Sequence, residues 1–365
     1  METPSSRAAA PGERAPVDAC FATQAEACRH LGSPFTAALC EMLRADLDTR
    51  SAFGRRILSW GRRATADALA LRAAGALHFL ARSKRAPELA AAYPPQDVGE
   101  AALRRALAAA IGEHDEFLAG FLDRPPQTNE AARSSILLGG ALYVASVVKR
   151  PLEILEIGAS AGLNLHFDRY SHDLGVGRWG PPDAGLRLVC DWRGAPPPLC
   201  APLEIAARSG CDVDPLDPGL PADRERLLAY VWPDQAERLA RMETALALAA
   251  RREERVERAD AGDFLAARLA APLAPGRARL LHHSIVWQYL PLETKTRAKA
   301  LIEAAGAAAT RAAPFAWARM EADGDMRSAA VTLTLWPSGE SVALGRADFH
   351  GRWAQWNAKA PVPIS

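Results

Sequence analysis

The segment LEILEIGASAG, residues 152–162, constrains the fold more than any other part of the sequence. It is a short apolar run closed by glycine, which is typical of a buried strand that ends in a tight turn. Upstream of Pro151 the apolar residues recur at helical spacing, and we find no strand pattern. Downstream, strands alternate with helices, which is typical of a parallel sheet with crossover helices. The sequence therefore predicts an α/β fold.

We expect the chain to be organised in three parts. Residues 1–16 are rich in Pro, Ala, Ser and Arg and are expected to form a disordered tail. Residues 17–149 are expected to form a helical domain, and residues 150–358 a Rossmann-like domain. Within the latter, Gly, Pro and Trp dominate residues 171–201, which we interpret as a long insertion or flap.

Local patterns predict several elements. Ser33-Pro34 marks a helix start, with Ser33 as a potential cap. Further helices are expected from Leu69 to Leu80, from Leu103 to Phe121, from Asn129 to Val148 and from Thr296 to Ala309. After the strand at 152–158, apolar runs predict buried strands that begin at 279 and 315, and an antiparallel hairpin at 330–336 and 341–347.

Composition excludes some classes of function. The chain carries 44 Lys plus Arg against 43 Asp plus Glu, so its net charge of +1 gives no footprint for nucleic acid. No run of 18 apolar residues predicts a membrane helix, and the N-terminus lacks the apolar core of a signal peptide. We therefore expect a cytoplasmic protein with no membrane partner. No sequence feature indicates an oligomeric state.

The six cysteines are interpreted mostly as small buried apolar residues, because none forms a C-x-x-C pair. Cys190, Cys200 and Cys211 match no standard zinc-ligand spacing, so no metal site is predicted.

The turn after the first strand favours a ligand without phosphate. A dinucleotide site needs G-x-G-x-x-G so that a pyrophosphate can approach bare backbone. Here Ser160 stands at the second glycine and Leu163 at the last. S-adenosylmethionine has no phosphate and tolerates a looser loop, and Glu156 is placed to hold its ammonium group.

LEIGASAG resembles the first motif of class I S-adenosylmethionine-dependent methyltransferases, acid-x-Gly-x-Gly-x-Gly, with Ser160 as the departure. Downstream, SGCDVDP (209–215), RADAGDF (258–264) and LLHHSIVWQYLP (280–291) resemble the ends of the second, third and fourth strands. The hairpin at 330–347 resembles the reversed last strand of that fold. The cofactor-binding residues that this resemblance implies are Glu156, Gly158, Ser160, Gly162, Asn164, Asp212 for the ribose and Asp260 for the adenine amine.

The ribose acid has two candidates. Asp212 lies 50 residues after Gly162, whereas this acid usually follows the last glycine by about 20 residues. The insertion at 171–201 accounts for the excess if Asp212 is the acid. Alternatively LRLVCD (186–191) is the second strand and Asp191 is the acid.

Over nearly its whole length the chain also resembles an uncharacterised bacterial family, domain of unknown function 2332. The segments that carry this resemblance are PQTNEAARS (126–134), LEIGASAGLNL (155–165), DWRG (191–194), CDVDPLDP (211–218), HHSIVWQYLP (282–291) and LWPSGESVALGRADFHG (335–351).

Three groups of residues have a second interpretation. GASAG is also G-x-S-x-G, the nucleophile elbow of α/β-hydrolases, with Ser160 as nucleophile, Asp263 as acid and His283 or His350 as base. His282 and His283 point to opposite faces of a strand, so one is expected in the core and His283, with Ser284, at a pocket. PQTNEAARS supplies either a helix cap from Thr128 or Asn129, or a polar group over the loop from Asn129, Glu130 and Arg133.

These patterns together predict an enzyme that uses S-adenosylmethionine to methylate a small molecule. Asp263, His283 and Ser284 are the candidate catalytic residues, as a base or as groups that position the acceptor. The alternatives are a binding protein that keeps the fold without the chemistry, and a serine hydrolase that uses Ser160.

Overall fold

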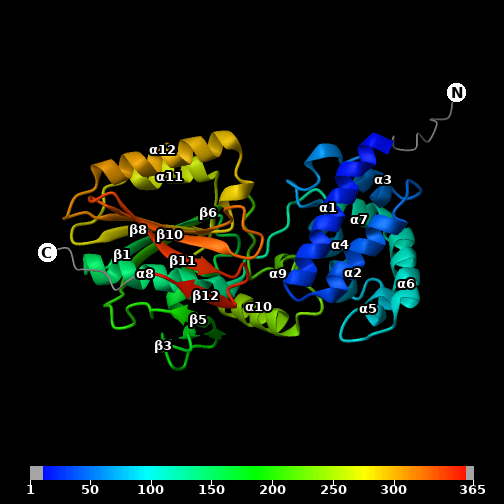
Figure 1. Cartoon of the computed structure of the whole chain (residues 1–365), viewed down its shortest axis with the longest axis horizontal. Helices are drawn as coiled ribbons and strands as arrows, with labels where there is room; N and C mark the ends of the chain where they lie inside the picture. The colour runs from blue at the N-terminus through cyan, green and yellow to red at the C-terminus, as the bar shows by residue number, and fades with distance from the viewer. Residues whose placement is uncertain (1–10, 359–365) are drawn as a thin grey trace. The chain divides into compact units, whose positions relative to one another are not determined.

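The computed structural model of the chain describes residues 11–358, which form two compact units (Figure 1). One unit is helical and comprises residues 11–128 and 221–240. The other contains the sheet and comprises residues 129–220 and 241–358. Of the tail expected at 1–16, the first ten residues lie outside the described part of the chain, and the rest belongs to the first helix.

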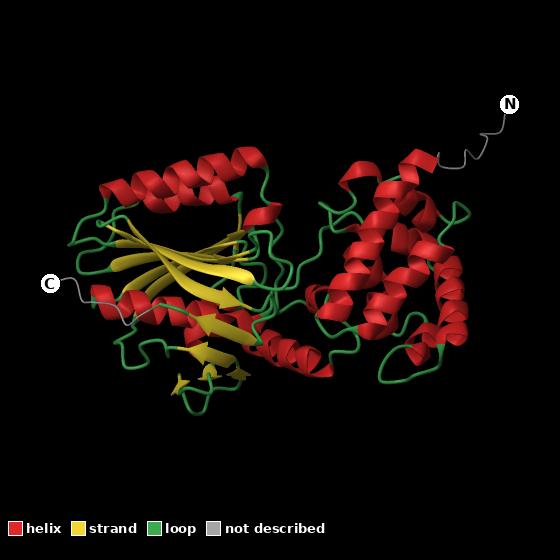
Figure 2. Cartoon of the chain, in the orientation of Figure 1, coloured by secondary structure: helices red, strands yellow, loops and turns green. Residues whose placement is uncertain are grey.

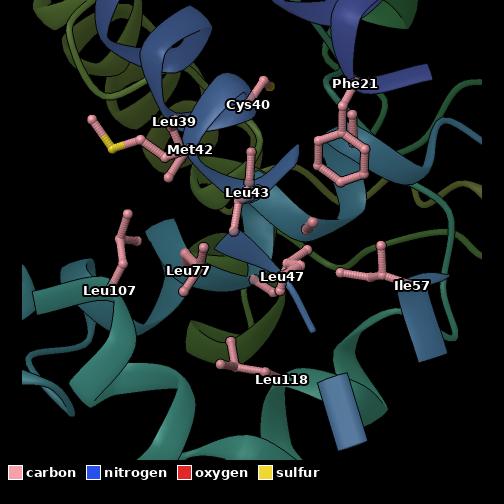
Figure 3. Close-up of a cluster of buried hydrophobic side chains, with 14 of the residues drawn as sticks. Phe21, Leu39, Cys40, Met42, Leu43, Leu47, Ile57, Leu77, Leu107 and Leu118 are labelled. Carbon is pink, nitrogen blue, oxygen red and sulfur yellow. The ribbon is translucent and has the colours of Figure 1, made fainter. Parts of the chain in front are cut away.

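The helical unit packs its amphipathic helices around one apolar core, in which Leu39, Leu43 and Leu77 are buried (Figure 3). The single helix expected from Leu103 to Phe121 is divided at His114. The elements are α1 (Pro11–His30), α2 (Pro34–Asp46), α3 (Ala52–Leu58), η1 (Gly61–Arg63), α4 (Leu69–Arg82), α5 (Pro87–Ala92), α6 (Glu100–Glu113), α7 (Asp115–Phe121), α9 (Pro221–Ala229) and the start of α10 (Ala236–Ala249).

The start of α2 follows the sequence signal with one correction. Ser33 occupies the N-cap position and Pro34 the first turn, as expected, but the Ser33 side chain makes no capping bond. It donates instead to Asp234, whose other oxygen accepts from the backbone N of Phe35 at 2.9 Å. The N–H of Phe35, which has no partner within the helix, is therefore satisfied by a residue remote in sequence.

Nine strands form the main sheet of the other unit, in the order β5-β12-β11-β10-β9-β8-β1-β6-β7. Figure 2 shows this sheet with helices on both of its faces. The strands β7, β6, β1, β8 and β9 are parallel, and β10, β11 and β12 continue the sheet with antiparallel pairings. The strands are β1 (Leu152–Ile157), β5 (Asp191–Gly194), β6 (Ile205–Asp212), β7 (Glu257–Arg258), β8 (Ala278–Ser284), β9 (Phe315–Glu321), β10 (Ala329–Trp336), β11 (Glu340–Ala347) and β12 (Trp353–Trp356).

This order confirms the expected α/β fold and its closing hairpin. From β1 the chain runs outward through β6 and β7, then returns to place β8 and β9 on the other side of β1. The sheet is therefore doubly wound, and the direction of winding reverses between β1 and β8. Among the described residues no strand precedes β1, also as expected.

Helices cover both faces of the sheet (Figure 1). Leu152 and Ile154 of β1 pack in the cluster around α8 (Ser134–Val148), whereas Leu155 and Ile157 pack under α11 (Ala261–Ala270) and α12 (Leu292–Ala308). Burial on both faces explains why the apolar residues of LEILEI do not follow a strict two-residue alternation.

Within residues 11–358, one apolar segment is long enough to cross a membrane by length and composition alone. It runs over Ala131–Val148, which combines the turn η2 (Ala131–Arg133) with α8, and it is 89% buried inside the protein. It is the core helix of the sheet unit.

The segment 171–201 is fixed to the core by several buried residues rather than forming a flap. It forms a small sheet of β2 (Ser171–Asp173), β3 (Arg178–Trp179) and β4 (Arg187–Val189), followed by β5. Trp192 of β5 is buried in the cluster around α8. The unit boundaries also differ from those expected, because residues 129–149 belong to the sheet unit and residues 221–240 to the helical unit.

Gly139 of α8 tests this packing. A Cβ at Gly139 would lie 2.5 Å from Cη2 of Trp192. We expect Gly139→Ala to lower the free energy of unfolding by about 1–3 kcal/mol through overpacking, although alanine is the better helix former. Urea unfolding followed by tryptophan fluorescence measures this change.

The adjacent Gly140→Ala is the matched control. Its Cβ would lie 3.7 Å from that of Ala318, an ordinary contact distance. It should leave stability unchanged or raise it by up to about 1 kcal/mol. Equal losses in both variants would contradict the packing described.

Candidate functional site

The carboxyl ends of the parallel strands meet at one edge of the sheet, which we call the carboxyl edge. Doubly wound sheets bind ligands outside this edge, at the point where the winding reverses. Here that point is between β1 and β8. The loop after β1, residues 158–163, lies there beside Asp212 at the end of β6 and Ser284 at the end of β8.

Every second residue of the β1 loop, from 158 to 162, has a left-handed backbone conformation. Gly158, Ser160 and Gly162 have φ values of 68°, 54° and 75°. Glycine adopts this conformation freely, whereas it costs a residue such as serine roughly 1–2 kcal/mol. The loop therefore has the backbone that three alternating glycines would favour, with a serine held in the middle position.

Two side chains hold this loop. The backbone N–H groups of Ala161 and Leu163 donate to Oδ1 of Asn129, at 3.2 and 3.1 Å. The N–H of Ser160 donates to Oδ2 of Asp212 at 3.0 Å. Such bonds matter because a buried N–H without a partner costs about 1–3 kcal/mol.

The N–H groups of Ala159 and Gly162 are bonded as well. Ala159 donates to the carbonyl of Cys211 at 2.9 Å, and Gly162 to that of Ala159 at 2.7 Å. Each N–H from 159 to 163 is thus used within the protein. A pyrophosphate site requires such groups to point at the ligand, so the loop offers no phosphate cradle.

The segment before α8 serves both as a helix cap and as a contact to the loop. Asn129 reaches the loop, as one of the two sequence interpretations expects, and itself has a left-handed φ of 24°. The cap of η2 comes from the side chain of Glu130 rather than from the expected Thr128 or Asn129. Arg133 donates to the carbonyls of Phe349 and Ser284, at 2.8 and 3.4 Å, and so joins two loops of the carboxyl edge.

Glu156 is a buried acid beneath this loop. The residue is 2% exposed, and its side-chain atom Oε2 has no hydrogen-bond partner among the described residues. Burial raises the pKa of this carboxyl well above its ordinary value, the charge of Asp212 raises it further, and Arg133 opposes both. A buried carboxyl in this state gains free energy from any cation brought next to it.

His282 lies opposite Glu156 in the register of β1 and β8. It is also buried, and neither ring nitrogen has a hydrogen-bond partner in the described part of the chain. Burial lowers its pKa to about 3, so the ring is neutral at physiological pH. Two neighbouring polar groups thus lack partners at the point where the winding reverses.

The two candidates for the ribose acid lie far apart. Asp212 ends β6, directly beside β1, and burial raises its pKa. Asp191 begins β5 at the opposite edge of the sheet, where its side chain is 61% exposed and pairs with Arg193. Only Asp212 lies beside the β1 loop, so Asp191 is excluded as a partner of a ligand bound there.

Asp260 and Asp263 have different surroundings. Asp260 follows β7 and caps α11, accepting from the N of Gly262 at 2.7 Å and from Oγ1 of Thr294 at 2.9 Å. Asp263 is exposed on α11 and pairs with Arg297 at 2.6 Å. The expected catalytic role of Asp263 finds no support in this position.

Asn164, one of the expected cofactor-binding residues, is buried, and its Oδ1 accepts from Oγ of Ser134 at 2.8 Å.

His283 is fully buried, with both ring nitrogens bonded. Nε2 accepts from the indole N–H of Trp317 at 3.0 Å, so Nδ1 carries the proton and donates to Glu321 at 2.6 Å. The ring also stacks on Trp287, with 5.3 Å between centroids. As placed, it has no lone pair for a substrate proton, contrary to the expected role as a base.

Sequence reasoning missed the anchor of the β8 loop. Glu321, at the end of β9, accepts from the backbone N of Val286 and Trp287 at 3.1 and 3.2 Å. Before them stands Ile285, with a φ of 52°, which is a strained conformation for a β-branched residue. A Cβ on Gly158 would lie 2.2 Å from Cγ2 of Val286, so the two loops touch. The signal available in the sequence was Glu321, an acid at the end of the apolar strand FAWARME.

Cysteines do not gather at this edge. Cys211 is buried in β6, Cys190 is buried next to β5, and Cys200 is exposed. Within residues 11–358 no group of three or more His, Cys, Asp or Glu side chains is arranged to hold a metal ion.

The buried Glu156 carboxyl makes a pH-dependent contribution to stability. Its pKa is raised by folding, so the stabilisation is full below the ordinary pKa of 4.5 and is lost as pH rises toward the folded value. In that window the free energy of unfolding should fall by about 1.4 kcal/mol per pH unit.

Glu156→Gln should remove this component and should be more stable than the parent at pH 8. Urea unfolding of both proteins from pH 4 to 8 measures the difference. Parallel pH profiles for the two proteins would show that Glu156 is not the buried acid described.

Comparison with known proteins places the chain in a family. No curated protein and no solved structure matches it. The family model described as "Uncharacterized protein conserved in bacteria (DUF2332)" matches residues 18–356, nearly the whole chain, which confirms the resemblance to that uncharacterised family. The chain therefore belongs to this bacterial family.

Proposed function

We propose that the protein binds S-adenosylmethionine at the carboxyl edge and transfers its methyl group to a small molecule. The observation that carries this proposal is the backbone conformation and hydrogen bonding of the β1 loop. Its left-handed residues at 158, 160 and 162 suit a close ligand, while its N–H groups from 159 to 163 are all used within the protein. Such a loop fits a cofactor without phosphate better than a dinucleotide.

Two acids are placed to hold that cofactor. Glu156, with its unpartnered Oε2, would pair with the ammonium group. Asp212 accepts from the backbone N of Ser160 and Asp214, and each of its oxygens has capacity for one more bond from a ribose hydroxyl. Asp260 would lie on the adenine side, because β7 is the next strand outward.

The acceptor would be positioned rather than activated. S-adenosylmethionine supplies an electrophilic methyl group, so the protein has to place the attacking atom in line with it. The strained β8 loop from Ser284 to Val286 borders the reversal point and is held by Glu321. Since His283 is bonded on both sides, Ser284 is the remaining candidate of the three for contact with the acceptor.

A serine hydrolase is the second candidate, because the left-handed Ser160 after a strand fits a nucleophile elbow. Its other members fit poorly. His283 is committed to Trp317 and Glu321, and Asp263 pairs with Arg297 on the surface. The geometry favours the cofactor site.

Isothermal titration of the purified protein with S-adenosylmethionine tests the proposal. We expect saturable binding that Glu156→Gln and Asp212→Asn each weaken by roughly tenfold or more, or about 1.4 kcal/mol. Asp191→Asn is the matched control, because it makes the same chemical change at the far edge of the sheet and should bind as the parent does. NADH should not bind.

Absence of binding to the folded protein would overturn the proposal. Labelling of Ser160 by a fluorophosphonate would favour the hydrolase instead. Binding without methyl transfer to any acceptor in a panel would contradict the enzyme and leave a binding protein of the same fold.

A further inference from the structure

A cavity of about 190 Å³ lies next to the β1 loop within the sheet unit. Only Ala161 of that loop borders it, and none of the cofactor-binding residues proposed above does. The volume is below the roughly 300–1,000 Å³ of pockets for drug-sized ligands, so it suits a small group. The side chains that give the cavity its polar character are His166, Asp217, Arg252, Glu254 and Arg255.

His166 contributes a hydrogen-bond donor. The residue is 4% exposed, and its Nδ1 accepts from Nη1 of Arg208 at 3.2 Å. Since arginine can only donate, the proton of the neutral ring resides on Nε2. Burial, together with the nearby Arg252, Arg208 and Arg169, lowers the pKa of His166 to about 2, so the ring stays neutral in a positive environment.

Arg252 contributes a cation that is only partly satisfied. Its guanidinium lies over the ring of Tyr170, with Cζ 5.4 Å from the centroid. Its Nη1 is buried and has no hydrogen-bond partner among the residues described. A buried guanidinium N–H without an acceptor is costly, and an anion would relieve that cost.

The charged residues that line the cavity are two arginines and two acids, so their formal charges balance. Nε of Arg255 is 3.9 Å from Oδ1 of Asp217, which also accepts a hydrogen bond from the backbone N of Gly219. Glu254 is exposed. The Glu254 carboxylate is therefore in contact with water, whereas Nη1 of Arg252 and the ring of His166 are buried and carry N–H donors.

We propose that this cavity binds a small oxyanion, the phosphate or carboxylate group of a metabolite. The planar guanidinium of Arg252 matches two oxygens of such a group, and Nε2 of His166 supplies a neutral donor. The proposal is independent of the cofactor site, because it uses none of the residues assigned there.

Titration of the full chain with inorganic phosphate and, separately, with malonate at constant ionic strength tests this site. We expect saturable binding of at least one anion, weakened roughly tenfold or more by Arg252→Gln. Tighter binding of phosphate would identify a phosphoryl ligand, and tighter binding of malonate a carboxylate.

Arg251→Gln is the matched control, since Arg251 is exposed, carries the same charge and does not line the cavity. It should bind as the parent does. Equal weakening in the two variants would mean general charge attraction and would overturn the site, as would absence of binding by both anions to the folded parent. Thermal unfolding without anion checks that Arg252→Gln is folded.

Discussion

The carboxyl edge depends on how the loop after β1 is held. Asn129 precedes the sheet and Asp212 ends its second parallel strand, yet both accept hydrogen bonds from the same short loop. Without them, buried N–H groups of a strained backbone would have no partner. The bonds also join the segment before η2, the loop after β1 and the end of β6. Because the protein supplies these acceptors itself, the loop is preorganised for a ligand that does not need its N–H groups.

A second support comes from the other side of the reversal point. Glu321 holds the backbone of the β8 loop and orients His283, while Val286 fills the space over Gly158. The strain at Ile285 is retained because these contacts fix the loop. The two regions around β1 differ in charge. Glu156 and Asp212 suit a cationic group, whereas the cavity lined by Arg252 suits an anion.

The sequence predicted the elements whose signal is local. β1, β8 and β9 are short runs rich in apolar residues, and the closing hairpin consists of two such runs around a turn, so each was recognisable without tertiary information. The position of Glu156 at the end of β1 followed from the same patterns, which the chain carries residue by residue. The position of Asp212 at a strand end was implied only by the resemblance to methyltransferase motifs.

The rest depends on contacts between distant segments. LRLVCD and the strand that ends at Asp212 are both plausible from sequence, and only the strand order separates them. The cap of α2 comes from Asp234, and the bond from Asn129 to the loop spans 32 residues or more. The surroundings of His283 and Asp263 could not be predicted for the same reason, since their partners Trp317 and Arg297 are each 34 residues away.

The measurement that tests the account most directly is a crystal structure of the full chain grown with S-adenosylhomocysteine. The account predicts the ligand at the β1 loop, with its ammonium group near Glu156, its ribose hydroxyls on Asp212, and the N–H groups of the loop still bonded to Asn129. Ligand bound elsewhere, or an empty carboxyl edge at saturating concentration, would contradict it.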